Sequence, residues 1–383
     1  MRFFLLLLIA LSFVHAQHRV YLRQSNTIPL YSQQTDYWCG AATTQMLLRG
    51  YPNGKEHAFD QTHVWDTIQK YKVETGWASD PEGMKGALNN LADSHVGGFW
   101  QIFWWKKGYN PGPNLMYWIA RGMTELKFPA HATVYGHGHA LVVTGLTTSK
   151  NPVNVPSGPI NLINIEVHNP WPPNKGEKVY MTGSHWYSRY FYPPNSPSNS
   201  KWSECMLATV HIAKNSNAFK EELPITQGPV LVAPKLQKQG EVISTAVAKL
   251  KMHEVLKGKI RESDQQILGG LTMLQPILVN KNHQGYYLIP FGNVRTNESS
   301  AAIILNAYTG DFEAMSVFGK PFFYLNEREY RVKNINIEAV FSPSKECRSP
   351  FTPLWKSVSS FDEAVYYDYE GNIVTLEKLT REN

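Results

Sequence analysis

The chain has few cysteines, no cluster of positive charge and, beyond its first residues, no long apolar run. Cysteine occurs only three times in 383 residues, as Cys39, Cys205 and Cys347. No segment after the N-terminus is apolar over the length that crosses a membrane. The net charge of +6 is small for this length, and neither a Lys/Arg run nor a nucleic-acid-binding motif is present. We therefore expect neither an integral membrane segment nor a nucleic-acid partner.

The N-terminus has the pattern of a secretory signal peptide. Arg2 supplies a positive start, residues 3–14 are almost wholly apolar, and Ala16 ends a short stretch suited to cleavage. The apolar run is too short to span a bilayer comfortably. We expect residues 1–16 to be removed and the mature chain to be secreted or periplasmic. An uncleaved anchor is the alternative.

The odd number of cysteines favours one free thiol in an exported protein. If Cys39 is that thiol, Cys205 and Cys347 either pair and join the two halves of the chain, or are both free and buried. The sequence leaves both arrangements open.

Tryptophan is unevenly distributed, which suggests two structural units. Of eleven tryptophans, only Trp355 follows residue 213. Residues 214–240 carry Pro, Gly and Asn at many positions, as a linker does. We expect a first domain over residues 17–213 and a smaller accessory domain over residues 241–383.

In the first unit, the patterns predict helices followed by strands. Apolar residues at helical spacing predict helices over Cys39–Arg49, Asp60–Tyr71, Pro81–Ala92 and Pro113–Met123. Runs rich in Val, Ile and Thr predict strands over Ala130–Tyr135, His139–Leu146, Ile160–Val167 and Met206–Ile212. This order indicates an α+β unit with separate layers.

The second unit is also predicted to be α+β. One helix is expected over Val242–Leu256. Strands are expected over Leu271–Val279, Gly285–Ile289, Ala301–Ala307 and Asp311–Ser316, with a hairpin of Ala364–Tyr369 and Ile373–Leu379. There is no heptad pattern and no clear long repeat.

The segment around Cys39 carries the strongest chemical signal. A thiol attacks a carbonyl only as the thiolate, and a helix beginning at Cys39 directs its positive end at the sulfur. His139, at the start of an apolar strand, is the expected general base. Asn169 ends the next strand, where its side-chain oxygen is placed to accept the second imidazole N–H. Gln33, six residues before Cys39, is the expected oxyanion donor, together with the backbone N–H of Cys39.

Each of these residues also has a plain structural interpretation. Cys39 alone would be inert packing. His139 would be a buried strand histidine, and Asn169, which precedes a proline, a turn residue. Gln34 competes with Gln33 for the oxyanion role, and only the spacing favours Gln33.

Taken together, the pattern resembles papain-like cysteine peptidases. Gln33-x5-Cys39-Gly40, Gly138-His139 and Asn169-Pro170-Trp171 occur in that order. The pattern is most similar to the branch that contains the bacteriocin-leader-processing (double-glycine) peptidases and their secreted relatives. The resemblance covers roughly residues 28–213, one domain's worth of chain. It implies a papain-like fold, with Cys39 as nucleophile, His139 as base, Asn169 as orienting residue and Gln33 as oxyanion donor. Many relatives of that branch carry Asp where this chain has Asn169.

A shorter resemblance concerns the second unit. Residues 286–290 and 302–311 are similar to PepSY-type domains of exported proteins, which implies a module that inhibits, binds substrate or tethers the enzyme. Leu268-Gly269-Gly270 resembles the double-glycine site that leader-processing relatives cut. Self-cleavage after Gly270 is one interpretation, and a plain turn is the favoured one.

Two further groups of side chains have competing interpretations. His131, His137 and His139 suggest a metal site, but no Cys or carboxylate completes a ligand set nearby, so we expect no metal and no cofactor. The aromatic stretch of residues 99–105 either lines a groove for an extended peptide or packs in the core, and packing is favoured.

The function expected from the sequence is an exported cysteine peptidase that hydrolyses peptide bonds through a Cys39 acyl-enzyme. Its partner would be a peptide or protein substrate. The alternatives are a catalytically silent papain-like module that binds peptide or protein, and an acyl-transferase or deamidase that uses the same Cys–His pair. The sequence does not indicate an oligomeric state.

Overall fold

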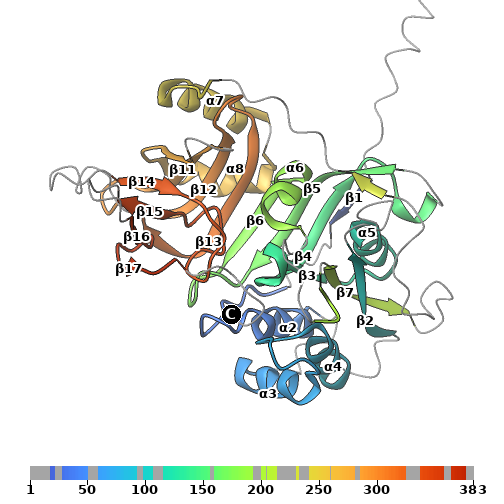
Figure 1. Cartoon of the computed structure of the whole chain (residues 1–383). Coiled ribbons are helices and arrows are strands. Elements are labelled where there is room, and N and C mark those ends of the chain that lie inside the picture. The colour runs from blue at the N-terminus through green and yellow to red at the C-terminus, as the bar shows by residue number, and fades with distance from the viewer. Residues whose placement is uncertain are drawn as a thin grey trace, which may run out of the picture.

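The fold combines helices with a large mixed β-sheet (Figure 1). The computed structural model describes residues 18–21, 28–50, 59–92, 98–106, 115–155, 159–192, 200–203, 205–213, 230–232, 241–258, 260–280, 285–324, 337–357 and 364–376. The expected signal peptide and most of the expected linker lie outside these residues. The predicted α+β class is confirmed.

Three helices, α2 (Cys39–Arg49), α3 (Gln61–Tyr71) and α4 (Pro81–Leu91), gather at the lower end of the view in Figure 1. The starts of α3 and α4 follow from local chemistry, whereas α2, preceded by Trp38, has no side-chain cap. Asp60 caps α3 by accepting the His63 N–H, and Asp80 caps α4, whose first residue is a proline. All three match the predicted helices closely. A fourth, α5 (Leu115–Leu126), overlaps the prediction that started at Pro113, a residue outside the described ranges.

The first half of the sheet is antiparallel. Its strands pair in the order β2 (Gly98–Lys106), β7 (Cys205–Ala213), β3 (Ala130–Val134), β4 (His139–Thr148), β5 (Pro159–Asn169) and β6 (Glu177–Thr182). Strand β1 (His18–Tyr21) pairs with β4, and β8 (Val230–Val232), inside the expected linker, pairs in parallel with β5. The short helix α6 (Gly183–His185) follows β6.

The second half of the sheet continues from β6. The pairing order is β13 (Phe312–Phe323), β12 (Glu298–Asn306), β11 (Tyr286–Asn293), β10 (Ile277–Val279), β14 (Ile337–Val340), β15 (Leu354–Ser357), β16 (Val365–Tyr367) and β17 (Ile373–Val374). The single strand predicted over Leu271–Val279 is wrong: it is divided into β9 (Thr272–Met273) and β10, which pair with opposite ends of β11.

Helices α7 (Thr245–Gly258) and α8 (Glu262–Gly269) cover one face of β11–β13. Alternate strand residues separate the two faces, as the period of two requires. Tyr287, Ile289 and Ile303 pack with these helices, whereas Leu288 and Ile304 belong to the larger core shared with α2–α5. The Gly269-Gly270 pair forms the C-terminal end of α8.

The strands β6 and β13 join the two halves of the sheet. Their register runs from Met181 opposite Ala314 to Glu177 opposite Phe318. The start of β6, which lies directly opposite Asn169 at the end of β5, is therefore enclosed by the second unit.

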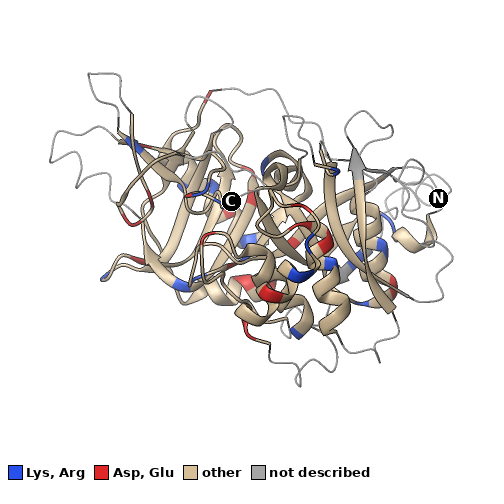
Figure 2. Cartoon of the chain, turned by 60° about the horizontal axis from the view of Figure 1, so that its bottom comes forward, with Lys and Arg blue, Asp and Glu red and all other residues tan. Residues whose placement is uncertain are grey.

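The cysteines and the charges complete the description. Cys39, Cys205 and Cys347 are all free and buried, so of the two arrangements left open by the sequence the unpaired one is observed. Lysine, arginine and acidic residues are interspersed along the elements in the view of Figure 2. Within the described residues, no helix has the length and apolar character needed to cross a membrane.

Candidate active site

Cys39 is the first residue of α2, and its sulfur faces the start of β4. The backbone N–H groups of Ala140 and Gly40 hydrogen-bond to the sulfur. The residue is only 8% exposed. Burial raises the pKa of the Cys39 thiol, while the charge of Arg348 and these N–H groups act in the opposite direction. The resting thiol is therefore protonated at neutral pH, with donors already in place for the thiolate.

Gly40 allows the start of α2 to lie against the loop of residues 72–80. A Cβ at this position would lie 2.5 Å from the Cβ of Ser79 and 3.2 Å from the sulfur of Met84. Only glycine permits such a close approach of the backbone. The Cys-Gly pair thus places the nucleophile and one wall of the site in contact.

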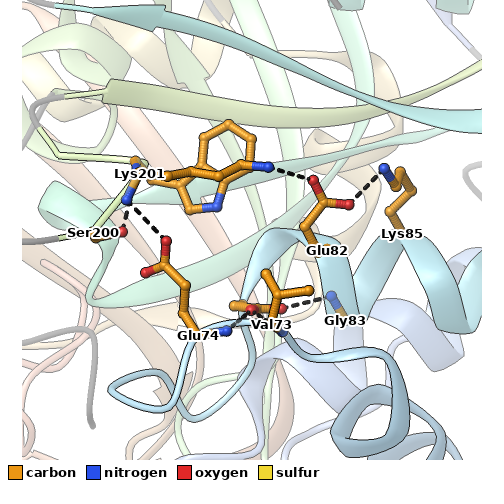
Figure 3. A network of polar contacts seen from close by, with 9 residues as sticks. Val73, Glu74, Glu82, Gly83, Lys85, Ser200 and Lys201 are labelled. Carbon is orange, nitrogen blue, oxygen red and sulfur yellow. Dashed lines mark hydrogen bonds and ion pairs between the residues drawn. The ribbon is translucent and has the colours of Figure 1, made fainter.

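The loop of residues 72–80 is held by a buried carboxylate. Asp80 accepts the backbone N–H groups of Val73 at 2.7 Å, Glu74 at 2.7 Å and Gly83 at 2.6 Å. Glu74 in turn accepts the backbone N–H of Lys201 at 2.9 Å (Figure 3). Charge-assisted bonds of this kind fix the loop from both sides.

A small cavity opens beside Cys39. Its walls come from α2, from the loop of residues 72–80 and from the β3–β4 hairpin, and they include Cys39, Trp77, Ser79, Thr133, His137 and His139. Its volume is about 20 Å³, the space of about one water molecule. Cys39 and His139, which are far apart in the sequence, therefore share one cavity.

His139 begins β4 and is oriented by Asn169, which ends β5. The imidazole Nε2 lies 2.7 Å from the Asn169 Oδ1. The orientation of this amide follows from its other neighbours: Nδ2 donates to the Glu177 carboxylate at 2.8 Å and to the Arg348 carbonyl at 3.3 Å, and Oδ1 accepts the Trp171 N–H at 3.0 Å. Because Oδ1 is an acceptor, Nε2 of His139 must carry the proton.

The second ring nitrogen of His139 is consequently a free base. Nδ1 is buried and has no hydrogen-bond partner among the described residues. Burial, together with the charge of Arg348, lowers the pKa of His139 to about 3, against the opposing effect of Asn169. The imidazole is neutral at neutral pH, and His139 lines the same cavity as Cys39.

Glu177, which the sequence analysis missed, extends the relay behind Asn169. It is fully buried, and its second oxygen accepts the Ser316 hydroxyl of β13 at 2.8 Å. Burial raises the pKa of Glu177 to about 7, although bonds from Ser349, Ser316 and Asn169 favour the charged form. Glu177 starts a strand that was not predicted, so no local signal linked it to Asn169.

Gln33 is buried next to the Asn169 turn. Its backbone N–H donates to the Pro170 carbonyl at 3.0 Å, and its side-chain Nε2 donates to the Thr35 carbonyl at 2.7 Å. Gln34 is exposed instead. Gln33 is not among the residues that line the cavity. One of its two amide hydrogens is engaged with Thr35, and the other is the one left for an oxyanion.

Histidines near the site serve packing and local hydrogen bonding. The His137 Nε2 contacts the Cys205 carbonyl at 2.6 Å, and its ring lies 5.0 Å from that of Trp77. His131 is buried, and burial lowers its pKa to about 4. In the described part of the chain, no group of three or more His, Cys, Asp or Glu residues is placed to hold a metal ion.

The aromatic stretch lies on β2, away from the cavity. Trp100 is buried against His211, with ring centroids 5.3 Å apart, and Phe103 stacks on Trp118 at 5.7 Å. None of these side chains lines the cavity. The side chain of Trp105 lies outside the described residues. Packing is therefore the role that the geometry supports.

Arg348 is the second residue that the sequence analysis missed. It comes from the segment between β14 and β15, is fully buried, and its guanidinium lies 5.3 Å from the ring centre of Trp171. The charge of Arg348 acts on both Cys39 and His139. The second unit thus contributes a buried cation next to Trp171 and Asn169, although Arg348 is not among the residues that line the cavity.

Comparison of the chain with protein-family models, curated proteins and solved structures finds no match. The chemical assignment therefore depends on the site geometry: a thiol at a helix start, a neutral imidazole with a defined tautomer, and an amide that orients it.

Proposed function

We propose that this chain is a papain-like cysteine peptidase that hydrolyses peptide bonds through an acyl-enzyme on Cys39. One observation carries the proposal. Nε2–H of His139 donates to Oδ1 of Asn169 at 2.7 Å, which leaves Nδ1 as the unprotonated nitrogen of a histidine that lines the same cavity as Cys39. A histidine that served packing alone would not need an amide, itself oriented by Glu177, to select its tautomer.

The first half of the reaction transfers the acyl group to the enzyme. The thiol proton of Cys39 moves to Nδ1 of His139, and the thiolate attacks the substrate carbonyl carbon. The oxyanion that forms accepts the backbone N–H of Cys39. For Gln33 to add its remaining Nε2 hydrogen, its side chain has to turn toward the cavity, because it is buried outside the cavity wall. The C–N bond then breaks, and the leaving amine takes the proton from Nδ1.

The second half releases the product. A water molecule gives a proton to Nδ1 as its oxygen attacks the thioester carbonyl, and the C–S bond breaks. The carboxylic product leaves and the proton returns to the Cys39 sulfur. Throughout, Oδ1 of Asn169 accepts the Nε2 proton of His139 and stabilises the imidazolium in each half-reaction.

The proposed substrate is a peptide or a protein, and the signal-like residues 1–16 favour action outside the cytoplasm. The chemistry uses only side chains and backbone N–H groups. The PepSY-like second unit would contribute to the site through Ser316 and Arg348 rather than act as a detached module.

A catalytically silent binding module is the second candidate. The observation in its favour is that the thiol is almost wholly buried, beside a cavity that has space for about one water molecule. An acyl-transferase or deamidase would use the same residues and differs in its product.

The test compares the wild type with Cys39→Ala and His139→Ala on a peptide library, with new termini read by mass spectrometry. Cys205→Ala is the matched control, because it removes another buried thiol outside the cavity. New termini are expected for the wild type and for Cys205→Ala only. New termini that persist in Cys39→Ala would contradict a peptidase. The proposal is also contradicted if the wild type forms no new termini although the epoxide inhibitor of papain-like enzymes labels it. Amide-to-acid changes without new termini would instead indicate a deamidase.

A further inference from the structure

Arg348 reaches the site from a tight turn of the second unit. Ser344 and Cys347 exchange two backbone hydrogen bonds, at 3.0 and 3.2 Å. The Cys347 thiol also donates to the Thr352 carbonyl at 3.2 Å. The carbonyl of Arg348 itself accepts the Asn169 side chain at 3.3 Å. The backbone of Arg348 is therefore fixed against the His–Asn relay, and its side chain is not a mobile surface group.

The guanidinium of Arg348 is buried without an ordinary hydrogen-bond acceptor. Its Nε, Nη1 and Nη2 atoms have no hydrogen-bond partner in the described part of the chain. Trp171 offers only an aromatic face, at 5.3 Å. Asp36 and Glu346 attract the charge through space. A buried cation is unfavourable unless an acceptor or a counter-charge meets it, so this position requires a further partner.

The group that answers this charge most strongly is Cys39. Burial is the largest influence on the Arg348 guanidinium and lowers its pKa, and among the neighbouring groups that favour the charged form Cys39 acts more strongly than Asp36 or Glu346. A neutral thiol is a weak acceptor, whereas a thiolate forms strong, charge-assisted bonds. The contact becomes a proper ion pair only when Cys39 has lost its proton.

His139 is poorly suited to be the resting counter-ion of the thiolate. Its imidazole is buried, and the neighbouring guanidinium disfavours a second positive charge there. The base and the counter-ion are therefore different residues in this site.

We propose that Arg348 is the positive charge that stabilises the Cys39 thiolate, so that the second unit completes the nucleophile. The inference concerns the same site and rests on the proposed chemistry at Cys39. Arg348 acts on the reacting sulfur, and His139 is left to move protons. The other titratable groups around this pair are Tyr37 and His137 in the cavity wall, with Asp36 and Glu346 facing the guanidinium.

The test is the pH profile of Cys39 alkylation by iodoacetamide, measured by peptide mapping from pH 5 to pH 10. Arg348→Met removes the charge, and Arg348→Lys keeps it. An adjacent positive charge typically shifts a thiol pKa by about 1–3 units. Because burial raises the pKa of the wild-type thiol, the readout is the alkylation rate at each pH below the midpoint. At pH 7 Arg348→Met should alkylate about tenfold or more slowly than the wild type, and Arg348→Lys should regain most of the rate.

Lys356→Gln is the matched control, because it removes one positive charge from β15, where Lys356 faces Glu338 at 3.9 Å. Its profile should superimpose on that of the wild type, and Cys39→Ala supplies the background. A folded Arg348→Met with the wild-type profile would overturn the inference. A folded Arg348→Lys that alkylates ten times more slowly than the wild type at pH 7 would also overturn it. If Arg348→Met does not melt cooperatively, and so is not folded, the alkylation rate of Arg348→Lys is the deciding measurement.

Alkylation needs no substrate, so the two proposals fail separately. A shifted Arg348→Met profile in a chain that cuts no peptide would remove the peptidase and keep the role of Arg348. If the wild type cuts peptides and the alkylation profile of Arg348→Met is unshifted, the peptidase proposal stands and the role of Arg348 is lost.

Discussion

Replacing Asn169 by aspartate tests the buried relay directly, because position 169 faces the Glu177 carboxylate. The wild-type amide donates from Nδ2 to Glu177 at 2.8 Å and accepts from His139 at 2.7 Å. The introduced carboxylate would still accept from His139 but would have no hydrogen for Glu177. Two buried carboxylates would then face each other.

The two facing carboxylates either both stay charged or share one proton, and the option that costs less free energy sets the size of the effect. At 2.8 Å, two unit charges repel by about 6 kcal/mol at an effective dielectric constant of about 20. Holding one proton on Glu177 instead costs only about 0.4 kcal/mol at pH 7 and about 1.4 kcal/mol at pH 8, because burial already raises the pKa of Glu177 to about 7. The proton route costs less, so Asn169→Asp should hold a proton there and lose less than about 1 kcal/mol of unfolding free energy at pH 7 and roughly 1–2 kcal/mol at pH 8. The loss should grow toward pH 8 and shrink toward pH 6.

Urea unfolding followed by tryptophan fluorescence at pH 6, 7 and 8 measures this loss. The double variant Asn169→Asp with Glu177→Gln restores a donor opposite the introduced carboxylate and should regain most of the loss seen at pH 8, with Glu177→Gln alone as the control. The reasoning is refuted if the single variant is as stable at pH 8 as at pH 6, or if Glu177→Gln brings no recovery. Glu177 gives a physical reason for an amide rather than a carboxylate at position 169.

The remaining predictions concern the walls of the site and its pH dependence. Burial raises the pKa of Glu177 to about 7 from 4.5, so near neutral pH the folded state holds a proton that the unfolded state has lost. Wild-type stability should therefore fall by about 2 kcal/mol from pH 5 to pH 7, and urea titrations should show a flatter curve for Glu177→Gln. Gly40→Ala should lower the unfolding free energy by about 1–3 kcal/mol and slow Cys39 alkylation, because its Cβ meets Ser79 at 2.5 Å. Gly258→Ala, with no atom within 4 Å, should do neither. Asp80→Ala should cost about 3 kcal/mol by freeing three backbone N–H groups, and thermal melts that show no loss would contradict this role.

Local chemistry made the helices and the central strands of the first unit predictable. Pro81 and its neighbouring Asp cap mark a helix start, and Val- and Thr-rich runs mark β4 and β5. Strand β2 was missed because aromatic residues crowd both of its faces and hide the alternation. Strand β6 is short and follows a turn rich in proline, and α8 has only eight residues of mostly polar character.

The sequence by itself determined which residues carry the proposed chemistry at short range. Cys39 starts a helix, His139 starts a strand and Asn169 ends the next one, and each position follows from caps, periodicity and turns along the chain. Only the tertiary structure decided what surrounds them. Glu177 and Arg348 reach the site because β6 pairs with β13 and a distant turn packs against the relay, contacts that join residues more than a hundred positions apart. No local periodicity encodes such pairings, since they depend on the free energy of burying one unit against the other.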